Sequence, residues 1–422
     1  MGLPFVIITR FATPLVTRVL LLLMPAVVLA KAATLAGLTR IEKTELTDFE
    51  TFHIVGRMIW QGRAAEAYHA GTMREVQRVV SGSDTFMPWT YPPPFDLVVA
   101  GVALLPVSLA YLLFTGATLA AFLLVLKRIA GEAFPAVLLA IFPAIVVTIG
   151  CGQNGFLSGT LIGLAALAFA GGRALAGLPL GLMVVKPHLA VAFALHAVAA
   201  RHWRCVGLAA CVVALACAAA TLALGIAVWP AFVSAVAEAK AFLVAGYYPL
   251  HRMISVYAAL RSLAVPAGVA LAVQAGVAFL ALSVVVATIR GRRDTATVLG
   301  ATALAGLFVS PYAYDYDLTL YGIALAFLMP DLIRRASPRE QIALLGLSLF
   351  TCGYGLLASV WHDRRVGQDI PYPGTAAWPP SLAGFALLAI VVLVWRILSR
   401  AAGPVAAPAR LGDGLPLAGG LR

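Results

Sequence analysis

The chain has 422 residues, of which 62% are hydrophobic and only 11% are charged, and its formal net charge is +12. Soluble domains carry roughly 25% charged and about 45–50% apolar residues, so the composition excludes an ordinary soluble protein and predicts many membrane-spanning helices. The positive charge alone would also suit a nucleic-acid-binding protein, but its distribution along the chain gives a better explanation.

Apolar stretches of roughly 17–25 residues are long enough to cross a bilayer as helices. They predict an all-α integral membrane protein, a polytopic bundle of about twelve transmembrane helices. Two stretches, 174–186 and 187–200, are short, which is tolerated where a helix lines a protein cavity. The predicted spans lie near 14–38, 104–126, 134–150, 156–172, 174–186, 187–200, 205–228, 264–289, 295–310, 317–333, 341–360 and 380–398.

Basic residues gather in alternate connections between these spans, and the positive-inside rule places those connections and both termini in the cytoplasm. The basicity is therefore a topology signal, and nucleic-acid binding is not expected. The first span has an alternative interpretation as a cleaved signal peptide, because "VVLAKAA" (27–33) has suitably spaced small residues. We expect one membrane domain, 1–400, followed by a disordered cytoplasmic tail, 401–422, that is rich in Pro, Ala and Gly.

The longest external loop, about 39–96, is predicted to be structured. Its segment "TFHIVGRMIWQG" has apolar residues at helical spacing, which suits a helix in the membrane interface. Trp60, Trp89 and Tyr91 are expected at headgroup depth. The prolines of "WTYPPPF" (89–95) fix an extended, stiff backbone, which is either a simple re-entry into the membrane or a wall above a cavity.

Short polar motifs occur at the outer ends of several predicted spans. Ionisable groups are costly at such positions unless they serve a cavity, whereas the opposite side shows only basic residues that flank spans. Their convergence predicts one external site built from several helix ends. The motifs are Asp48 to His53, "GQNG" (152–155), "KPH" (186–188), "YYPLHR" (247–252) and "SPYAYDYD" (310–317).

These motifs, in this order and together with "YPPPFDLVVAGVALLP", resemble the family 87 glycosyltransferases, membrane enzymes of the GT-C fold class. The resemblance covers about 40–330. It implies transfer of mannose from a polyprenyl-phosphate donor to an external glycolipid, with inversion at the anomeric carbon. Two departures, Phe52–His53 and Tyr312 with Tyr314, stand where family members commonly have other residues, so the expected sugar is a hexose, with mannose as the first candidate.

A glycosyl phosphate already carries a good leaving group, so its transfer needs mainly a base for the acceptor hydroxyl and cations for the departing phosphate. Asp48, which matches the family's first-loop aspartate, is the predicted base; the alternative is that it caps the helix from Phe49. Glu50 lies roughly 200° around that helix and is expected to be solvated.

The remaining candidate residues divide into two groups. Asp315 and Asp317 are two apart, so only one is expected to face the cavity while the other caps the span near Leu318. The donor phosphate is predicted to contact Lys186, His188, His251 and Arg252, for which membrane-surface or rim charges are the alternative. The sugar or acceptor is predicted to contact Tyr91, Gln153, Asn154, Tyr312, Tyr314, Asp315 and Asp317.

The sequence therefore predicts a hexosyltransferase of the cytoplasmic (inner) membrane with an extracytoplasmic active site. No metal and no cofactor are expected; the donor lipid is a substrate, and the expected partners are the bilayer, the lipid-linked sugar and a glycolipid or glycan acceptor. The rival hypotheses are a polytopic transporter or flippase of lipid-linked saccharides and a catalytically inactive paralogue that only binds glycolipid.

Overall fold

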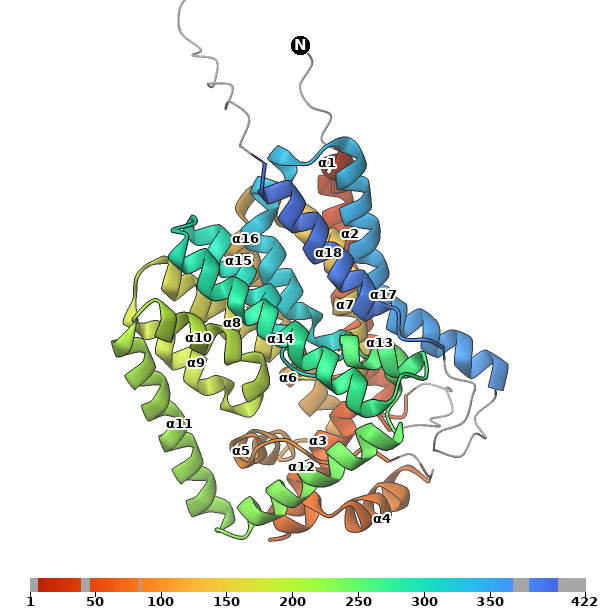
Figure 1. Cartoon of the computed structure of the whole chain (residues 1–422). Coiled ribbons are helices and arrows are strands. Elements are labelled where there is room, and N and C mark those ends of the chain that lie inside the picture. Colours follow the sequence, from red (N-terminus) through yellow and green to blue (C-terminus); the bar gives the residue numbers. More distant parts are fainter. Residues whose placement is uncertain (1–6, 39–45, 83, 85, 367–378, 401–422) are drawn as a thin grey trace, which may run out of the picture.

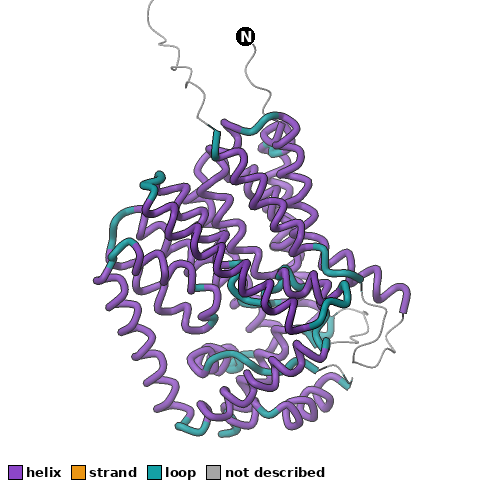
Figure 2. Tube along the Cα trace, viewed as in Figure 1, coloured by secondary structure: helices purple, strands orange, loops and turns teal. Residues whose placement is uncertain are grey.

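A computed structural model describes residues 7–38, 46–82, 84, 86–366 and 379–400. Within these ranges the chain is helical and has no strand, apart from one isolated bridge between Met253 and Tyr314 (Figure 2). The α-helices are α1 (Ile7–Phe11), α2 (Pro14–Leu35), α3 (Asp48–Trp60), α4 (Ala70–Ser81), α5 (Pro93–Val102), α6 (Val107–Ala130), α7 (Phe134–Cys151), α8 (Gly155–Ala170), α9 (Gly177–Leu182), α10 (Val191–Ala199), α11 (Trp203–Leu224), α12 (Val228–Ala245), α13 (Val256–Ser262), α14 (Ala267–Arg290), α15 (Thr295–Gly306), α16 (Thr319–Arg335), α17 (Pro338–Val366) and α18 (Ala383–Leu398). Short 3₁₀ helices are η1 (Ala65–Tyr68), η2 (Gly131–Ala133), η3 (Ala174–Ala176), η4 (Met183–Val185), η5 (Pro187–Leu189), η6 (Leu250–Arg252) and η7 (Asp315–Leu318).

Seven helical segments of the described chain are long and apolar enough to cross a membrane. This confirms an all-helical membrane protein, whereas the number of twelve spans is not confirmed. The predicted spans 174–186 and 187–200 are short pieces, because the chain changes to 3₁₀ geometry in η4 and η5 around Lys186 and Pro187. The seven segments are Pro14–Leu35, Val107–Cys151, Trp203–Leu224, Val228–Ala245, Ala267–Arg290, Asp315–Arg335 and Pro338–His362.

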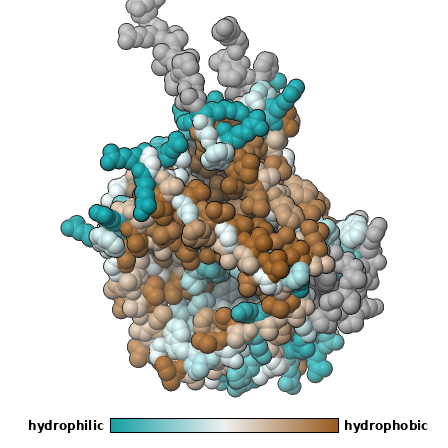
Figure 3. Space-filling view, in the orientation of Figure 1, coloured by the Kyte–Doolittle hydropathy of each residue, from teal (hydrophilic) through white to brown (hydrophobic). Residues whose placement is uncertain are grey.

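The described ends of the chain meet at one end of the bundle. The Ile8 N–H donates to Gln341 Oε1 at 3.3 Å, and the Arg400 guanidinium forms an ion pair with Glu340 at 2.6 Å. In Figure 1 this end is at the top, and α3, α4, α5 and α12 lie at the opposite end. Hydrophilic side chains cover the top, and a broad hydrophobic region lies below them (Figure 3). This distribution is that of a membrane protein with one strongly polar end.

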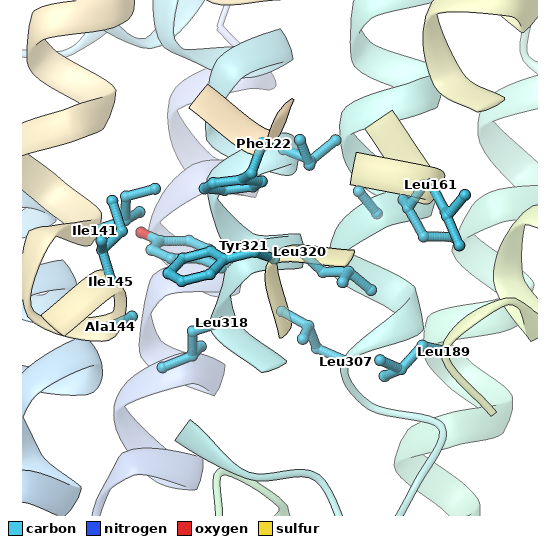
Figure 4. Close-up of a cluster of buried hydrophobic side chains, with 14 of the residues drawn as sticks. Phe122, Ile141, Ala144, Ile145, Leu161, Leu189, Leu307, Leu318, Leu320 and Tyr321 are labelled. Atoms are coloured by element: carbon cyan, nitrogen blue, oxygen red, sulfur yellow. The ribbon is translucent and has the colours of Figure 1, made fainter. Parts of the chain in front are cut away.

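Helix α16 runs through the centre of the bundle and packs against α6, α7, α8 and α15. Its side chains Leu320, Tyr321 and Ile323 are fully buried, and Figure 4 shows Tyr321 among Phe122, Ile141 and Leu318. The Tyr321 hydroxyl lies 2.6 Å from Ser348 Oγ, which satisfies its polar atom inside this apolar cluster. Helix α16 therefore fixes the position of η7, which immediately precedes it.

Three glycines of α8 form a stripe that lets neighbouring helices approach closely, the role that small residues have in membrane helix packing. A Cβ on Gly159 would lie 2.8 Å from Phe122, and one on Gly163 would lie 2.4 Å from Val125. At Gly155 the Cβ would lie 2.3 Å from the backbone carbonyl oxygen of Tyr316. Gly155 thus sets the distance between α8 and η7.

We expect Gly155→Ala to lower the free energy of unfolding by about 1–3 kcal/mol, because the added methyl group can fit only if the backbone of η7 shifts. Thermal denaturation in detergent would measure the loss. Gly116→Ala in α6 is the control, since no atom lies within 4 Å of its added Cβ and alanine favours a helix. Equal stability of the two variants would contradict the close approach of α8 and η7.

Candidate active site

A cavity of about 1050 Å³ collects the predicted site residues. Eleven of the twelve candidates line it; Asn154 is fully buried behind the wall. The contributing segments include the start of α3, the segment before α5, the end of α7, the turns around η4, η5 and η6, the segment before α16, and parts of α12, α14 and α17. The lining candidates are Asp48, Tyr91, Gln153, Lys186, His188, His251, Arg252, Tyr312, Tyr314, Asp315 and Asp317.

The first turn of α3 leaves Asp48 available to the cavity. The carboxylate of Glu50 accepts hydrogen bonds from the backbone N–H and the hydroxyl of Thr47, both at 3.0 Å, in a capping box. The expectation that Glu50 is solvated was wrong, because this side chain is buried and serves the helix start. Thr47, not Asp48, is the N-cap residue.

Asp48 Oδ1 accepts a hydrogen bond of 2.9 Å from Gln153 Nε2. Burial raises the pKa of the Asp48 carboxyl, and this effect outweighs the opposing influences of Arg252 and Gln153. A partly buried carboxylate with a raised pKa accepts a proton more readily than a solvated one. Asp48 therefore has the position and the basicity of a general base.

The orientation of the Gln153 amide is fixed by its neighbours. Gln153 Oε1 accepts from the Tyr91 hydroxyl at 2.8 Å and from the Asn154 N–H at 2.9 Å, so its NH₂ group faces Asp48. The preceding turn needs glycine at Gly152, which has φ of +67° and whose Cβ would lie 2.5 Å from Phe49 Cβ. The "GQNG" motif thus joins the first loop to the helix bundle beside Asp48.

Lys186 and Asp317 form a buried ion pair, with Nζ and Oδ1 at 2.5 Å and side chains 6% and 1% exposed. Lys186 Nζ also donates to Asn154 Oδ1 at 3.3 Å and lies 4.7 Å from the centre of the Tyr316 ring. The alternative of a lysine that extends to lipid headgroups does not describe this side chain. Its ammonium group instead lies inside the protein at the cavity wall.

Arg252 pairs with Asp315 through two hydrogen bonds, from Nε at 3.1 Å and from Nη2 at 2.9 Å. Nη2 also lies 3.1 Å from Cys151 Sγ at the end of α7. The Arg252 side chain is 23% exposed, whereas that of Asp315 is 1% exposed. The guanidinium therefore borders the cavity and is held by a carboxylate that is almost fully buried.

The expectation that only one of Asp315 and Asp317 faces the cavity was wrong, because both line it. They belong to the 3₁₀ helix η7, where Asp315 is paired with Arg252 and Asp317 with Lys186. Asp317 caps a helix start, but that of η7 and not that of α16 near Leu318: its Oδ2 accepts the Tyr314 N–H at 3.1 Å, and α16 has no side-chain cap. Both ion pairs thus depend on the geometry of this single turn.

The two candidate histidines are neutral at pH 7. Burial, reinforced by the charge of Lys186, lowers the pKa of His188 to about 4. Burial, reinforced by Arg252 and His362, lowers the pKa of His251 to about 3. His251 Nε2 lies 3.0 Å from Ser359 Oγ. As neutral rings they can contact a phosphate as hydrogen-bond donors but add no positive charge.

Four tyrosines form a continuous aromatic wall. Tyr314 and Tyr316 are stacked, with ring centres 5.2 Å apart, and Tyr312 meets Tyr314 edge-on at 5.1 Å. Tyr248 continues the row at 4.8 Å from Tyr312. The sequence motif indicated Tyr312 and Tyr314 but not Tyr316, whose partner Lys186 is distant in sequence. Such a wall offers faces and hydroxyls to a sugar.

The first loop is held by a buried polar cluster. Asp96 accepts hydrogen bonds of 2.9 Å from both the Tyr68 hydroxyl and the Trp89 indole N–H. Trp89 is 2% exposed, so its side chain cannot anchor the loop among lipid headgroups as predicted; its ring packs against Phe52 and Phe95. The proline-rich segment is therefore a wall above the cavity and not only a return into the membrane.

The profile of glycosyltransferase family 87 matches residues 89–311, just over half of the chain. No match was found among curated proteins or among solved structures. The matched range includes Gln153, Lys186 and Arg252, whereas Asp48 precedes it and Asp315 and Asp317 follow it.

Proposed function

Since this chain belongs to glycosyltransferase family 87 and its described residues include seven helical segments fit to cross a membrane, we propose that it transfers a hexose from a polyprenyl-phosphate donor to a glycolipid or glycan acceptor. The observation that carries the proposal is the arrangement of Asp48, Lys186 and Arg252 around one cavity that also has apolar walls. Mannose is the first sugar to test, because the family resemblance implies it.

In the proposed reaction, Asp48 takes the proton of the acceptor hydroxyl as its oxygen attacks the anomeric carbon. The bond from that carbon to the phosphate oxygen breaks, and the electron pair leaves with the phosphate. Attack from the face opposite the phosphate inverts the anomeric configuration. Lys186 and Arg252 stabilise the negative charge on the departing phosphate, and the tyrosine wall with Gln153 orients the sugar.

We propose a GT-C-type bundle of about twelve spans in the cytoplasmic membrane, with the active site on the extracytoplasmic side. The basic side chains Arg334 and Arg335 end α16, whereas the site precedes its first residue. A helix of 17 residues separates these ends by about 25 Å at 1.5 Å per residue. The positive-inside rule favours a cytoplasmic location for the arginine end, which supports an extracytoplasmic site.

The test is transfer by purified protein in nanodiscs supplied with radiolabelled polyprenyl-phosphate mannose and a membrane glycolipid extract. Label in the glycolipid would support the proposal, and the same hexose supplied as a nucleotide sugar should give none. Proteoliposomes distinguish the transporter hypothesis, since a flippase would move the labelled lipid across the bilayer without forming a new glycolipid. Movement without transfer would overturn the enzymatic function.

The rate of transfer should fall on acidification at a pH higher than an ordinary aspartate would give. Asp48 acts as a base only when deprotonated, and burial raises its pKa above 3.8. Below that raised pKa, kcat/KM should fall about tenfold per pH unit, as for a single ionisation. The pH profile of kcat/KM would show this limb, with circular dichroism confirming that the protein stays folded. A value of kcat/KM that stays level down to pH 3.8, the ordinary aspartate pKa, would exclude Asp48 as the base.

A further inference from the structure

The positive and negative charges that line the cavity balance only when a residue outside the proposed catalytic set is counted. Asp48, Asp315 and Asp317 supply three carboxylates, while Lys186 and Arg252 supply two cations that are already paired with Asp317 and Asp315. The part of the cavity lined by these five residues, which we call the inner cavity, therefore carries a formal charge of −1. An anionic phosphate that enters this space meets no cation that is not already paired.

The remaining charged residue of the lining is Lys240, on α12. Its side chain is exposed, and it has no ion pair with any residue in the described ranges, unlike Lys186 and Arg252. With Lys240 counted, the formal charge of the lining becomes zero. Lys240 is thus a cation at the cavity wall. It can bind an added anion without breaking a native ion pair.

Lys240 belongs to a face of α12 that is otherwise apolar. Phe232, Val236 and Leu243 line the cavity at helical spacing, and Ala239 adjoins Lys240 on the same face. The start of α14 adds Leu271 to this lining. The lining therefore combines an apolar surface with a single cation close to one end of α12.

The polar end of this surface is next to the tyrosine wall. Tyr248, which soon follows α12, contacts the ring of Tyr312 at 4.8 Å, whereas Phe232 near the start of α12 contacts Tyr68 of the first loop. A molecule with an apolar chain and an anionic head can lie along α12, with the chain toward Phe232 and the head at Lys240. In that orientation its head group faces the tyrosines.

We propose that Lys240 binds the phosphate of the lipid-linked donor and that the lipid chain lies along the Phe232–Val236–Leu243 face of α12. This inference rests on the proposed function, because it assigns an isoprenoid phosphate to the same cavity. Charge complementarity selects this occupant over an uncharged lipid. Lys186 and Arg252 keep their role at the reacting phosphate oxygen, and Lys240 adds the charge that compensates the anion.

A binding assay that needs no catalysis tests the proposal. Binding of farnesyl phosphate to the full-length protein in nanodiscs of zwitterionic lipid would be compared with binding of farnesol and of inorganic phosphate. Lys240→Gln should weaken farnesyl phosphate binding about tenfold or more, since a hydrogen bond to a charged group is worth about 1.5–3 kcal/mol. Lys240→Arg should preserve it, and farnesol binding should not change.

Glu238→Gln is the matched control, because this exposed residue of α12 does not line the cavity; it should bind farnesyl phosphate like the wild type. Unchanged binding in Lys240→Gln would overturn the proposal and leave Lys240 as a contact of membrane headgroups. If inorganic phosphate bound as well as farnesyl phosphate and also depended on Lys240, the ligand of this site would be free phosphate and not the lipid. In the transfer assay, Lys240→Gln should raise KM and leave kcat nearly unchanged; absence of transfer in the wild type would refute the function without altering the binding result.

Discussion

Asp48→Asn is expected to lower kcat for sugar transfer about 10²–10⁴-fold, the usual contribution of a general base. The substitution keeps the size of the side chain and an oxygen that can accept the hydrogen bond from Gln153 Nε2. Folding and donor binding should therefore remain close to the wild type. Single-turnover transfer from radiolabelled donor would measure the chemical step separately from binding.

Glu66→Gln provides the control for this experiment, because it removes an exposed carboxylate of the same loop that does not line the cavity; its rate should match the wild type. If Asp48→Asn kept more than about a tenth of the rate, the base would have to be another residue. Asp315 and Asp317 would be the remaining carboxylates of the cavity lining, although each is paired with a cation.

Lys186→Gln is expected to lower the free energy of unfolding by about 3–5 kcal/mol, because it leaves the buried Asp317 carboxylate without its cation. Thermal and denaturant unfolding in detergent would measure this change. The double variant Lys186→Gln, Asp317→Asn removes both charges and should recover most of the stability, but transfer should stay low because the phosphate has lost a cation. The stability and the transfer rate of the double variant therefore separate the structural role of Lys186 from its functional role.

The pair Arg252–Asp315 offers a matched comparison. Its arginine side chain is 23% exposed, against 6% for Lys186, so solvent compensates Asp315 better and Arg252→Gln should destabilise less.

A double variant of Lys186 and Asp317 as unstable as the single variant would show that the ion pair is not what the loss of Lys186 disrupts. Coupling energies from the complete mutant cycle decide this point.

The positions of helices and the existence of one site could be predicted because both depend on local sequence. Apolar runs of sufficient length indicate membrane helices wherever they occur, and polar motifs at their outer ends indicated one cavity. Helix α12 was missed because its residues 228–245 directly follow another apolar run and include Glu238 and Lys240. The segment was therefore assigned to an external loop, and Lys240 with it.

The pairings inside the site could not be predicted, because they join residues distant in sequence. Lys186 and Asp317 are 131 positions apart, and Arg252 and Asp315 are 63 apart. Periodicity also gave the wrong result for Asp315 and Asp317, since helical geometry does not account for ion pairs on two sides of one turn. Glu50 was misassigned because a capping box buries a carboxylate that helical position alone would expose.

The excess of carboxylates over cations in the inner cavity has a consequence for turnover. A sugar phosphodiester carries one negative charge, whereas the lipid phosphate left after transfer carries about −1.5 to −2 at neutral pH. Asp48 has by then taken the acceptor proton, so the inner cavity is formally neutral, and repulsion of the phosphate rises when Asp48 releases that proton. In the proposed reaction, the loss of a proton that prepares Asp48 for the next turnover also weakens the binding of the lipid phosphate product, so this product should compete poorly with fresh donor.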